Sequence, residues 1–281
     1  MTDAFRARVR PLTESDFDAV RELARNACGI HLHQGKKALV SSRLERLVRG
    51  HGFDTFTDYI GFVSQRMQSA EFTEFIDTLT TNHSGFWREP EHFLFLRKTI
   101  FPSYGASLRI WSAACATGEE PYTLAMCALA DGAAHCRISA SDISRTALNT
   151  AMRGEYEVSK VLALPAGWGE RYFSAPAAAV TGAAVAGAAM AGVRCVIPAV
   201  RSMVGFAPVN LFEPFGHVGK FDVILCRNVM IYFEQATRDR LVDQLVGQLN
   251  PGGYLFTGHS ETLLRLPPAL RYIQPATYRK T

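Results

Sequence analysis

Residues able to bind a charged ligand gather in the segment 108–122, LRIWSAACATGEEPY. An apolar strand there breaks into small residues and Gly118, and a helix then opens with Glu119, Glu120 and Pro121. This order is typical of a nucleotide-type site at the carboxyl edge of a parallel sheet. Carboxylates at a helix N-terminus would repel a pyrophosphate. The segment therefore favours a nucleoside that carries positive charge.

Another acid, Asp142, follows the next predicted strand, which includes Ile138–Ser141. A carboxylate at that strand end can accept hydrogen bonds from both ribose hydroxyls. Asp142 could also cap a helix over 144–152, and Glu119 could simply complement the helix dipole. Beside the glycine loop we favour ribose binding for Asp142 and cofactor contact for Glu119. S-adenosylmethionine, with its sulfonium and ammonium groups, fits such acids.

Polar residues also follow the apolar strand predicted at 221–226. The strand ends in Arg227 and Asn228, and Tyr232 comes about one helical turn later. Asn228 offers both a donor and acceptors at the edge of the sheet. Tyr232 could be a site residue or a core aromatic with a satisfied hydroxyl, and the sequence leaves both open.

The segment TNHSGFWRE at 81–89 mixes polar groups with aromatic rings. It fits a lid in which the aromatics exclude water and Arg88 clamps a carboxylate. An ordinary linker with an Arg–Glu pair is the alternative.

The segment GHSE at 258–261 does not predict a Ser–His–Glu hydrolase. The chain has no G-x-S-x-G motif, and adjacent residues of a strand point to opposite faces. The histidines show no metal-ligand spacing, and the six cysteines form no C-x-x-C pair. We therefore expect no metal site, and buried reduced thiols rather than disulfides.

The pattern of elements predicts two domains. Short amphipathic helices, one capped by Thr13 and ended by Gly29, indicate a helical domain over 1–80, with a linker or lid over 81–107. Over 108–281, strands alternate with helices, which predicts an α/β, Rossmann-like parallel sheet. An insertion at about 155–204, which includes the β-rich residues 193–204, should form a small β-subdomain. The strands of the sheet are expected at 108–113, 136–141, 205–209, 221–226 and 253–257.

The composition is that of an ordinary globular chain. It is 48% hydrophobic with a net charge of only +4, which does not indicate nucleic-acid binding. Residues 175–193 carry almost no charge, but Ala and Gly supply too little transfer free energy for a membrane span, so we expect a surface hairpin or loop. The N-terminus lacks the apolar region of a signal peptide. We expect a cytoplasmic protein with no insertion into a membrane.

A basic stripe lies on the helix predicted at 36–49. Arg43, Arg46 and Arg49 recur three residues apart beside the apolar stripe, against the single acid Glu45. Such runs are usually a solvated helix face. The local excess of positive charge also fits an acidic partner surface, and both interpretations stay open.

Taken together, these segments resemble the bacterial chemotaxis-receptor glutamate methyltransferases, the CheR family. The resemblance covers nearly the whole chain through long motifs in the expected order: GIHL at 29–32, RLERLVR at 43–49, TNHSGFWRE at 81–89, WSAACATGEEPY at 111–122, ASDI at 140–143, VNLFE at 209–213, CRNVMIYF at 226–233 and GHSE at 258–261. It implies an N-terminal helical domain and a Rossmann-like S-adenosylmethionine-dependent methyltransferase domain with an inserted β-subdomain. It also implies methyl esterification of glutamates on the cytoplasmic helices of chemoreceptors, with S-adenosylhomocysteine as product, in chemotactic adaptation.

The resemblance also implies roles for particular residues. Arg88 and Tyr232 would sit near the departing methyl group, and Arg43, Arg46 and Arg49 would face the receptor helices. The inserted subdomain would dock a tethering peptide at the receptor C-terminus by strand addition, as in some family members. The Ala/Gly-rich stretch of this insert departs from the family pattern. Nine residues would line the cofactor site: Asn82, Ser84, Arg88, Glu119, Asp142, Asn210, Leu211, Arg227 and Asn228.

The chemistry of the implied reaction agrees with the residues available. A glutamate carboxylate, with a reference pKa of about 4.3, is ionised at neutral pH and needs no general base. Methylation of another protein or of a small molecule on the same scaffold is the alternative activity. A non-catalytic module that senses the cofactor or binds the receptor is the alternative of a different class.

Overall fold

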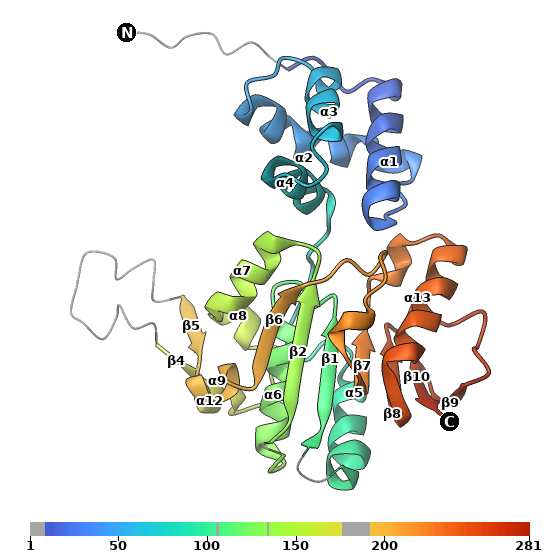
Figure 1. Ribbon diagram of the computed structural model, residues 1–281. Coiled ribbons are helices and arrows are strands. Elements are labelled where there is room, and N and C mark those ends of the chain that lie inside the picture. Colours follow the sequence, from blue (N-terminus) through green and yellow to red (C-terminus); the bar gives the residue numbers. More distant parts are fainter. Residues whose placement is uncertain (1–8, 105–106, 134, 176–191) are drawn as a thin grey trace. The chain divides into compact units, whose positions relative to one another are not determined.

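The computed structural model describes residues 9–104, 107–133, 135–175 and 192–281, and the chain forms two compact units. One unit comprises the chain up to Thr81 together with Tyr232–Arg238, and the other comprises Asn82–Ile231 and Asp239–Thr281. The helical domain expected over 1–80 is thus joined by a short segment from far along the chain. That return was not predicted. Figure 1 shows the elements of both units.

The described residues of the helical unit include four complete α-helices: α1 (Glu14–Cys28), α2 (Lys37–Gly50), α3 (Phe56–Ser64) and α4 (Ala70–Leu79). Thr13 caps α1 through a capping box with Asp16, and Gly29 ends it at φ 74°, as the sequence predicts. The apolar stripes of these helices meet in a core that includes Leu44, Tyr59 and Phe75.

The returning segment packs on the end of α1. Ile30 and Phe233 form an antiparallel bridge, and the His31 N–H donates to the Tyr232 carbonyl over 2.7 Å. The Nδ1 atom of His31 lies 2.9 Å from the Glu234 carboxylate. Tyr232 therefore belongs to the helical unit by its contacts.

The second unit is built on a seven-stranded sheet in the order β6-β2-β1-β7-β8-β10-β9 (Figure 1). The first five strands of that order are parallel, and β10 and β9 add antiparallel to the edge at β8. This is the doubly wound order of Rossmann-like sheets, so the predicted fold class is confirmed. The strands are β1 (Arg109–Ala113), β2 (Arg137–Asp142), β6 (Val204–Pro208), β7 (Phe221–Cys226), β8 (Leu249–Thr257), β9 (Leu270–Gln274) and β10 (Thr277–Lys280).

The five parallel strands lie where the sequence predicts them, with β8 beginning four residues early. Their apolar side chains form the core with helix α6, as at Ile110, Leu124, Leu225 and Phe256. The pair β9 and β10 was not predicted. The helices of this unit are α5 (Pro90–Phe95), α6 (Glu119–Ala130), α7 (Arg145–Arg153) and the part of α13 (Gln235–Gln248) from Asp239 onward. Shorter helical turns lie at Leu96–Ile100, Phe101–Ser103 and Gly216–Val218, and a further turn, Met230–Tyr232, leads into the segment that returns to the helical unit.

The insertion between β2 and β6 contains a separate three-stranded sheet. Its antiparallel order is β3-β5-β4, from β3 (Glu155–Glu157), β4 (Phe173–Ser174) and β5 (Val193–Val196). Most of the stretch expected as a hairpin or loop, 176–191, lies outside the described residues. Among the described residues, no helix combines the length and apolar character needed to cross a membrane. Short helices α8 (Val158–Val161), α9 (Trp168–Tyr172) and α12 (Pro198–Arg201) complete the insertion.

Candidate active site

The order of the strands reverses between β1 and β7, and this is where a doubly wound sheet binds its ligand. The carboxyl ends of β1 and β7 lead into the loops 114–118 and 227–228. The carboxyl end of β2, with Asp142, lies beside that of β1. The sheet therefore collects the predicted site residues of three strands at one edge.

Asp142 is buried and braces the loop after β1. Its Oδ2 accepts the N–H of Ala116 over 2.8 Å, and its Oδ1 accepts the N–H of Ser144 over 2.9 Å. The N-cap of α7 is Ser144, whose hydroxyl accepts the N–H of Ala147, so Asp142 is not the cap of that helix. The carboxylate thus holds the loop after β1 and the start of α7 at the end of β2.

Packing requires a glycine at position 118. Its φ is 94°, and a Cβ there would lie 2.7 Å from the Cβ of Ala151 and 2.8 Å from the hydroxyl of Tyr156. The glycine thus lets the start of α6 approach α7 and β3.

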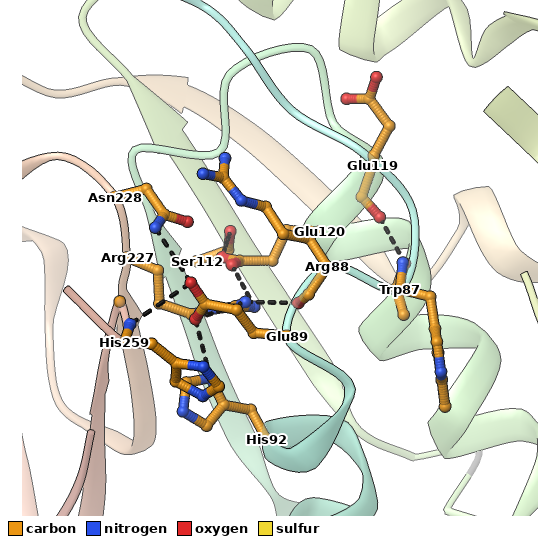
Figure 2. Close-up of polar contacts among 12 residues, drawn as sticks. Trp87, Arg88, Glu89, His92, Ser112, Glu119, Glu120, Arg227, Asn228 and His259 are labelled. Carbon is orange, nitrogen blue, oxygen red and sulfur yellow. Dashed lines mark hydrogen bonds and ion pairs between the residues drawn. The ribbon is translucent and has the colours of Figure 1, made fainter. Parts of the chain in front are cut away.

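Glu119 is fully buried, and its carboxylate is bonded within the protein. It accepts from Lys160 Nζ over 2.6 Å and from Thr117 Oγ1 over 2.7 Å. Figure 2 shows its side chain turned away from the cluster formed by Glu89, Arg227 and Asn228. Lys160 comes from the inserted subdomain, so this ion pair ties the insertion to the start of α6.

Arg227 is the centre of a buried ionic cluster. Its side chain is 2% exposed, and it forms ion pairs of 3.0 Å with both Glu89 and Glu120. It also donates to the Arg88 carbonyl, and Ser112 Oγ donates to Glu120 over 2.7 Å (Figure 2). Its guanidinium is thus bonded to three partners within the protein, which the sequence did not reveal.

Glu89 connects this cluster to Asn228. Burial alone would raise the pKa of Glu89, but Arg227 and the hydrogen bond from Asn228 lower it below its ordinary value. Asn228 Nδ2 donates to Glu89 Oε1 over 3.1 Å. The carboxylate of Glu89 is therefore ionised and orients the Asn228 side chain.

Unusual backbone geometry concentrates around these loops. Six non-glycine residues in the described part of the chain have positive φ, and four of them, Glu89, Ala114, Ala116 and Asn228, flank the carboxyl edge. Such conformations persist only where the surroundings enforce them, and they are frequent at functional sites.

The segment before α5 supplies three of the predicted residues. Asn82 Nδ2 donates to the Ser144 hydroxyl over 3.2 Å, which places it near Asp142. Ser84 is half-buried, and Arg88 Nη1 donates to the His83 carbonyl over 3.1 Å. In Figure 2 the Arg88 side chain extends away from the cluster around Arg227.

Asn210 and Leu211 follow β6, the neighbour of β2. The Val209 N–H donates to the Asp142 carbonyl over 3.1 Å, which holds this turn beside the acid. Asn210 Oδ1 accepts the N–H of Phe212, and Leu211 is buried. Two predicted site residues are thus adjacent to Asp142 through the backbone.

The four remaining predicted residues lie in the helical unit. Tyr232 belongs to the returning segment, and Arg43 donates to the carbonyls of Leu79 and Thr80 over 3.1 and 3.0 Å. Arg43 therefore ties α2 to the end of α4. Arg46 and Arg49 are exposed, and Arg49 pairs with Glu45 one helical turn away.

His92 is buried beside the cluster and must stay neutral. Neither of its ring nitrogens has a hydrogen-bond partner within the described residues. Burial and the nearby Arg227 lower the pKa of His92 to about 3. Nitrogens of His92 and His259 lie within 4.8 Å of a Glu89 oxygen, but Arg227, already bonded to Glu89, would repel a divalent cation there.

This burial predicts a pH-dependent stability. Between about pH 6.5 and 3 the unfolded chain binds a proton at His92 that the folded chain does not, so the free energy of unfolding falls with decreasing pH. The contribution is up to about 1.4 kcal/mol per pH unit. We expect His92→Phe to flatten urea-unfolding stability between pH 6.5 and 5, whereas His217→Phe, at an exposed histidine, should not. An unchanged slope in His92→Phe would contradict this.

A separate hollow of about 900 Å³ lies at the other edge of the sheet. It is lined by Arg109 and Arg137, the first residues of β1 and β2, and by His135 and Ser202. Ligands of doubly wound sheets bind at the carboxyl ends of the strands, so we assign the site to that edge.

Sequence reasoning missed the acids and the lysine that hold this site together. Glu89, Glu120, Lys160 and Glu261 are all bonded to residues at the carboxyl edge. Glu89 stands in the segment TNHSGFWRE and Glu261 in GHSE, so both motifs contained a signal. Their partners are far away in the chain, and only the fold reveals them.

Comparisons with known proteins identify the family of the chain. Residues 82–278 match the family described as "CheR methyltransferase, SAM binding domain", and residues 15–80 match "CheR methyltransferase, all-alpha domain". The chain is 37% identical to the chemotaxis protein methyltransferase of Borreliella burgdorferi, with 96% of this chain and 95% of that protein covered.

Two other relatives extend the comparison. Chemotaxis protein methyltransferase 1 of Pseudomonas aeruginosa is 35% identical, with 92% of this chain and 94% of that protein covered. The Escherichia coli chemotaxis protein methyltransferase is 37% identical, with 91% and 87% covered. The resemblance noted in the sequence is thereby confirmed, and the chain belongs to the CheR family of S-adenosylmethionine-binding methyltransferases.

Proposed function

We propose that this protein transfers the methyl group of S-adenosylmethionine to glutamate carboxylates of chemoreceptors, forming methyl esters for chemotactic adaptation. Membership of the CheR family supports this reaction, and relatives named chemotaxis protein methyltransferases support the receptor as substrate. The reaction takes place in the cytoplasm, on the cytoplasmic helices of the receptor.

The placement of Asp142 is the observation that carries the proposal. This buried carboxylate ends β2 beside the loop after β1, at the reversal of strand order where a nucleoside binds. Acids and amides at this edge suit a cofactor that carries positive charge. Residues that would line it are Asn82, Ser84, Arg88, Glu119, Asp142, Asn210, Leu211, Arg227 and Asn228.

The residues of the chain need only bind, orient and exclude water. When bound, the cofactor supplies a methyl group on a sulfonium. The substrate glutamate, with a reference pKa of about 4.3, is already anionic at neutral pH, so no residue must remove a proton. Arg88 holds the carboxylate in line, an effect that can lower the barrier by several kcal/mol. Two opposite charges are neutralised as the methyl is transferred, which a site sheltered from water favours.

Labelled methyl transfer tests the proposal. The protein is incubated with methyl-labelled S-adenosylmethionine and a cytoplasmic receptor fragment. We expect label on the fragment that alkali releases as methanol, because a carboxyl methyl ester is base-labile. Label that resists alkali, or a fragment without label, would contradict glutamate esterification.

We propose that the basic face of α2 meets the acidic receptor helices through Arg46 and Arg49. Arg46→Glu with Arg49→Glu should raise the receptor KM about tenfold, because each exposed charge pair contributes up to about 1 kcal/mol. Cofactor affinity should not change. Arg43 is left intact because it braces the end of α4.

The matched control is Arg25→Glu with Arg66→Glu, which changes net charge equally at two exposed arginines on α1 and after α3. Steady-state methylation at low and high salt distinguishes the two double variants, since screening weakens surface pairs. Equal KM values for both double variants would refute the basic-face assignment.

We also propose that the inserted sheet binds a peptide at the receptor C-terminus. The edge strands β3 and β4 flank β5, and an unpaired strand edge can accept an added strand. A receptor fragment with its C-terminal tail should then bind more tightly than the fragment without it, as measured by calorimetry. Equal affinities would remove this role.

A further inference from the structure

The turn after β8, residues 258–261 (GHSE), is held against the loop after β7 by one carboxylate. Glu261 is 3% exposed. Its Oε2 accepts the backbone N–H groups of Asn228 and Gly258, each over 2.7 Å, and its Oε1 accepts that of Ile231 over 3.1 Å. Three backbone donors on one buried carboxylate fix the path of the chain after β7.

Gly258 shows how closely the two loops approach. A Cβ at this position would lie 2.7 Å from Asn228 Nδ2, 2.7 Å from Glu261 Oε2 and 3.0 Å from the Asn228 nitrogen. Any side chain here would displace the amide of Asn228. The glycine and the acid of GHSE therefore act on the same neighbour.

Asn228 itself has a conformation that needs such support. Its φ is 58°, in the left-handed region, which asparagine tolerates at a cost in free energy. Glu89 holds its side chain through Nδ2, and Glu261 holds its backbone N–H. The residue is thus fixed from two sides by carboxylates on different elements.

We propose that Glu261 is a positioning residue that places the amide of Asn228 at the cofactor site. This inference rests on the proposed function, in which Asn228 contacts the cofactor. Glu261 contacts no cofactor itself and acts through the backbone of the loop 228–231. Without its charge the three N–H groups lose their shared acceptor, and the left-handed turn relaxes.

Glu261→Gln is the informative change, because it keeps the size of the side chain and removes one acceptor and the charge. The NH2 group of the glutamine would face backbone N–H groups that the carboxylate now accepts, and two donors cannot form a hydrogen bond with each other. The affinity for S-adenosylhomocysteine is measured by calorimetry on the full chain for the wild type, Glu261→Gln, Asn228→Ala and the double variant. The stoichiometry of each titration counts the folded sites.

We expect Glu261→Gln to weaken this affinity about tenfold per folded site, as for the loss of a hydrogen bond to a charged group. The double variant should bind within about twofold of Asn228→Ala alone, because the two residues act through one contact. If Glu261 had only a structural role independent of Asn228, the effects of the two substitutions on affinity would add instead.

Asp222→Asn is the matched control at the other end of β7. The carboxylate of Asp222 also accepts a backbone N–H, that of Arg109 over 2.9 Å, and a side-chain amide, that of Asn250 over 2.8 Å. The Asp222→Asn variant should have a lower melting temperature but the same affinity for S-adenosylhomocysteine per folded site as the wild type.

Three outcomes would overturn the inference. Glu261→Gln could behave as Asp222→Asn does, its effect could add fully to that of Asn228→Ala, or Asn228→Ala could bind as the wild type does. Turnover of the wild type on a receptor fragment, measured in parallel, reports on the proposed function separately. Binding and turnover can therefore fail independently.

Discussion

Asp142→Ala is expected to weaken the binding of S-adenosylmethionine and S-adenosylhomocysteine about 100-fold or more. In the proposed site the carboxylate accepts hydrogen bonds from two ribose hydroxyls, and each bond to a charged acceptor contributes about 1.5–3 kcal/mol. About 1.4 kcal/mol corresponds to a tenfold change in affinity. Calorimetry with both compounds measures the effect, which should be similar for the two because they share the ribose.

The control for Asp142→Ala is Asp222→Ala, near the amino end of β7. Asp222 also accepts a backbone N–H, that of Arg109 over 2.9 Å. It lies at the amino ends of the parallel strands, opposite the edge at which we propose the cofactor site. That variant should keep the affinity of the wild type. If Asp142→Ala also keeps it, the cofactor site is not beside β2, and the proposed set of cofactor residues is wrong.

Arg227→Met is expected to lower the free energy of unfolding by about 3–5 kcal/mol, as for other buried ion pairs that lose one partner. The substitution leaves the carboxylates of Glu89 and Glu120 partly buried without their shared cation. The side chain of Arg227 is only 2% exposed, so bulk water does not reach the position of its guanidinium to solvate the two carboxylates. Urea unfolding followed by circular dichroism measures the loss.

A triple variant that removes all three charges of the cluster separates the cost of burying an unpaired charge from the cost of lost packing. Arg227→Met combined with Glu89→Gln and Glu120→Gln should recover most of the stability, because no uncompensated charge then stays buried. Arg97→Met is the matched single control. Its ion pair with Asp131 is partly exposed, so its loss should cost under about 1 kcal/mol. Equal losses for Arg227→Met and Arg97→Met would contradict the account of the cluster.

The parallel strands could be predicted because their sequence pattern is local. A run such as FDVILC is apolar except for Asp222 near its start, as expected for a strand covered on both faces, and β7 coincides with it. The hairpin of β9 and β10 escaped prediction because its residues are mixed. In β9 only Leu270 is buried, while Arg271, Tyr272 and Ile273 are exposed, so no apolar run marks it.

The placement of Asp142 and Asn228 at one edge of the sheet could be predicted for the same reason. Asp142 ends β2 and Asn228 follows β7 by two residues, and the carboxyl ends of parallel strands meet at one edge. The sequence predicts a cofactor contact for Glu119 from its place after Gly118, but it did not reveal the ion pair with Lys160, which is formed across 41 positions of sequence. No local pattern predicts a partner so far along the chain.

Sequence by itself determined the α/β class, the five parallel strands and the family, because periodicity and long ordered motifs are properties of neighbouring residues. The tertiary structure alone decided that Arg227 is paired with Glu89 and Glu120, that Tyr232 returns to the helical unit, and that Glu261 holds Asn228. These contacts join residues that are distant in sequence. They depend on which strands become neighbours in the sheet, and the spacing of residues along the chain does not reveal that order.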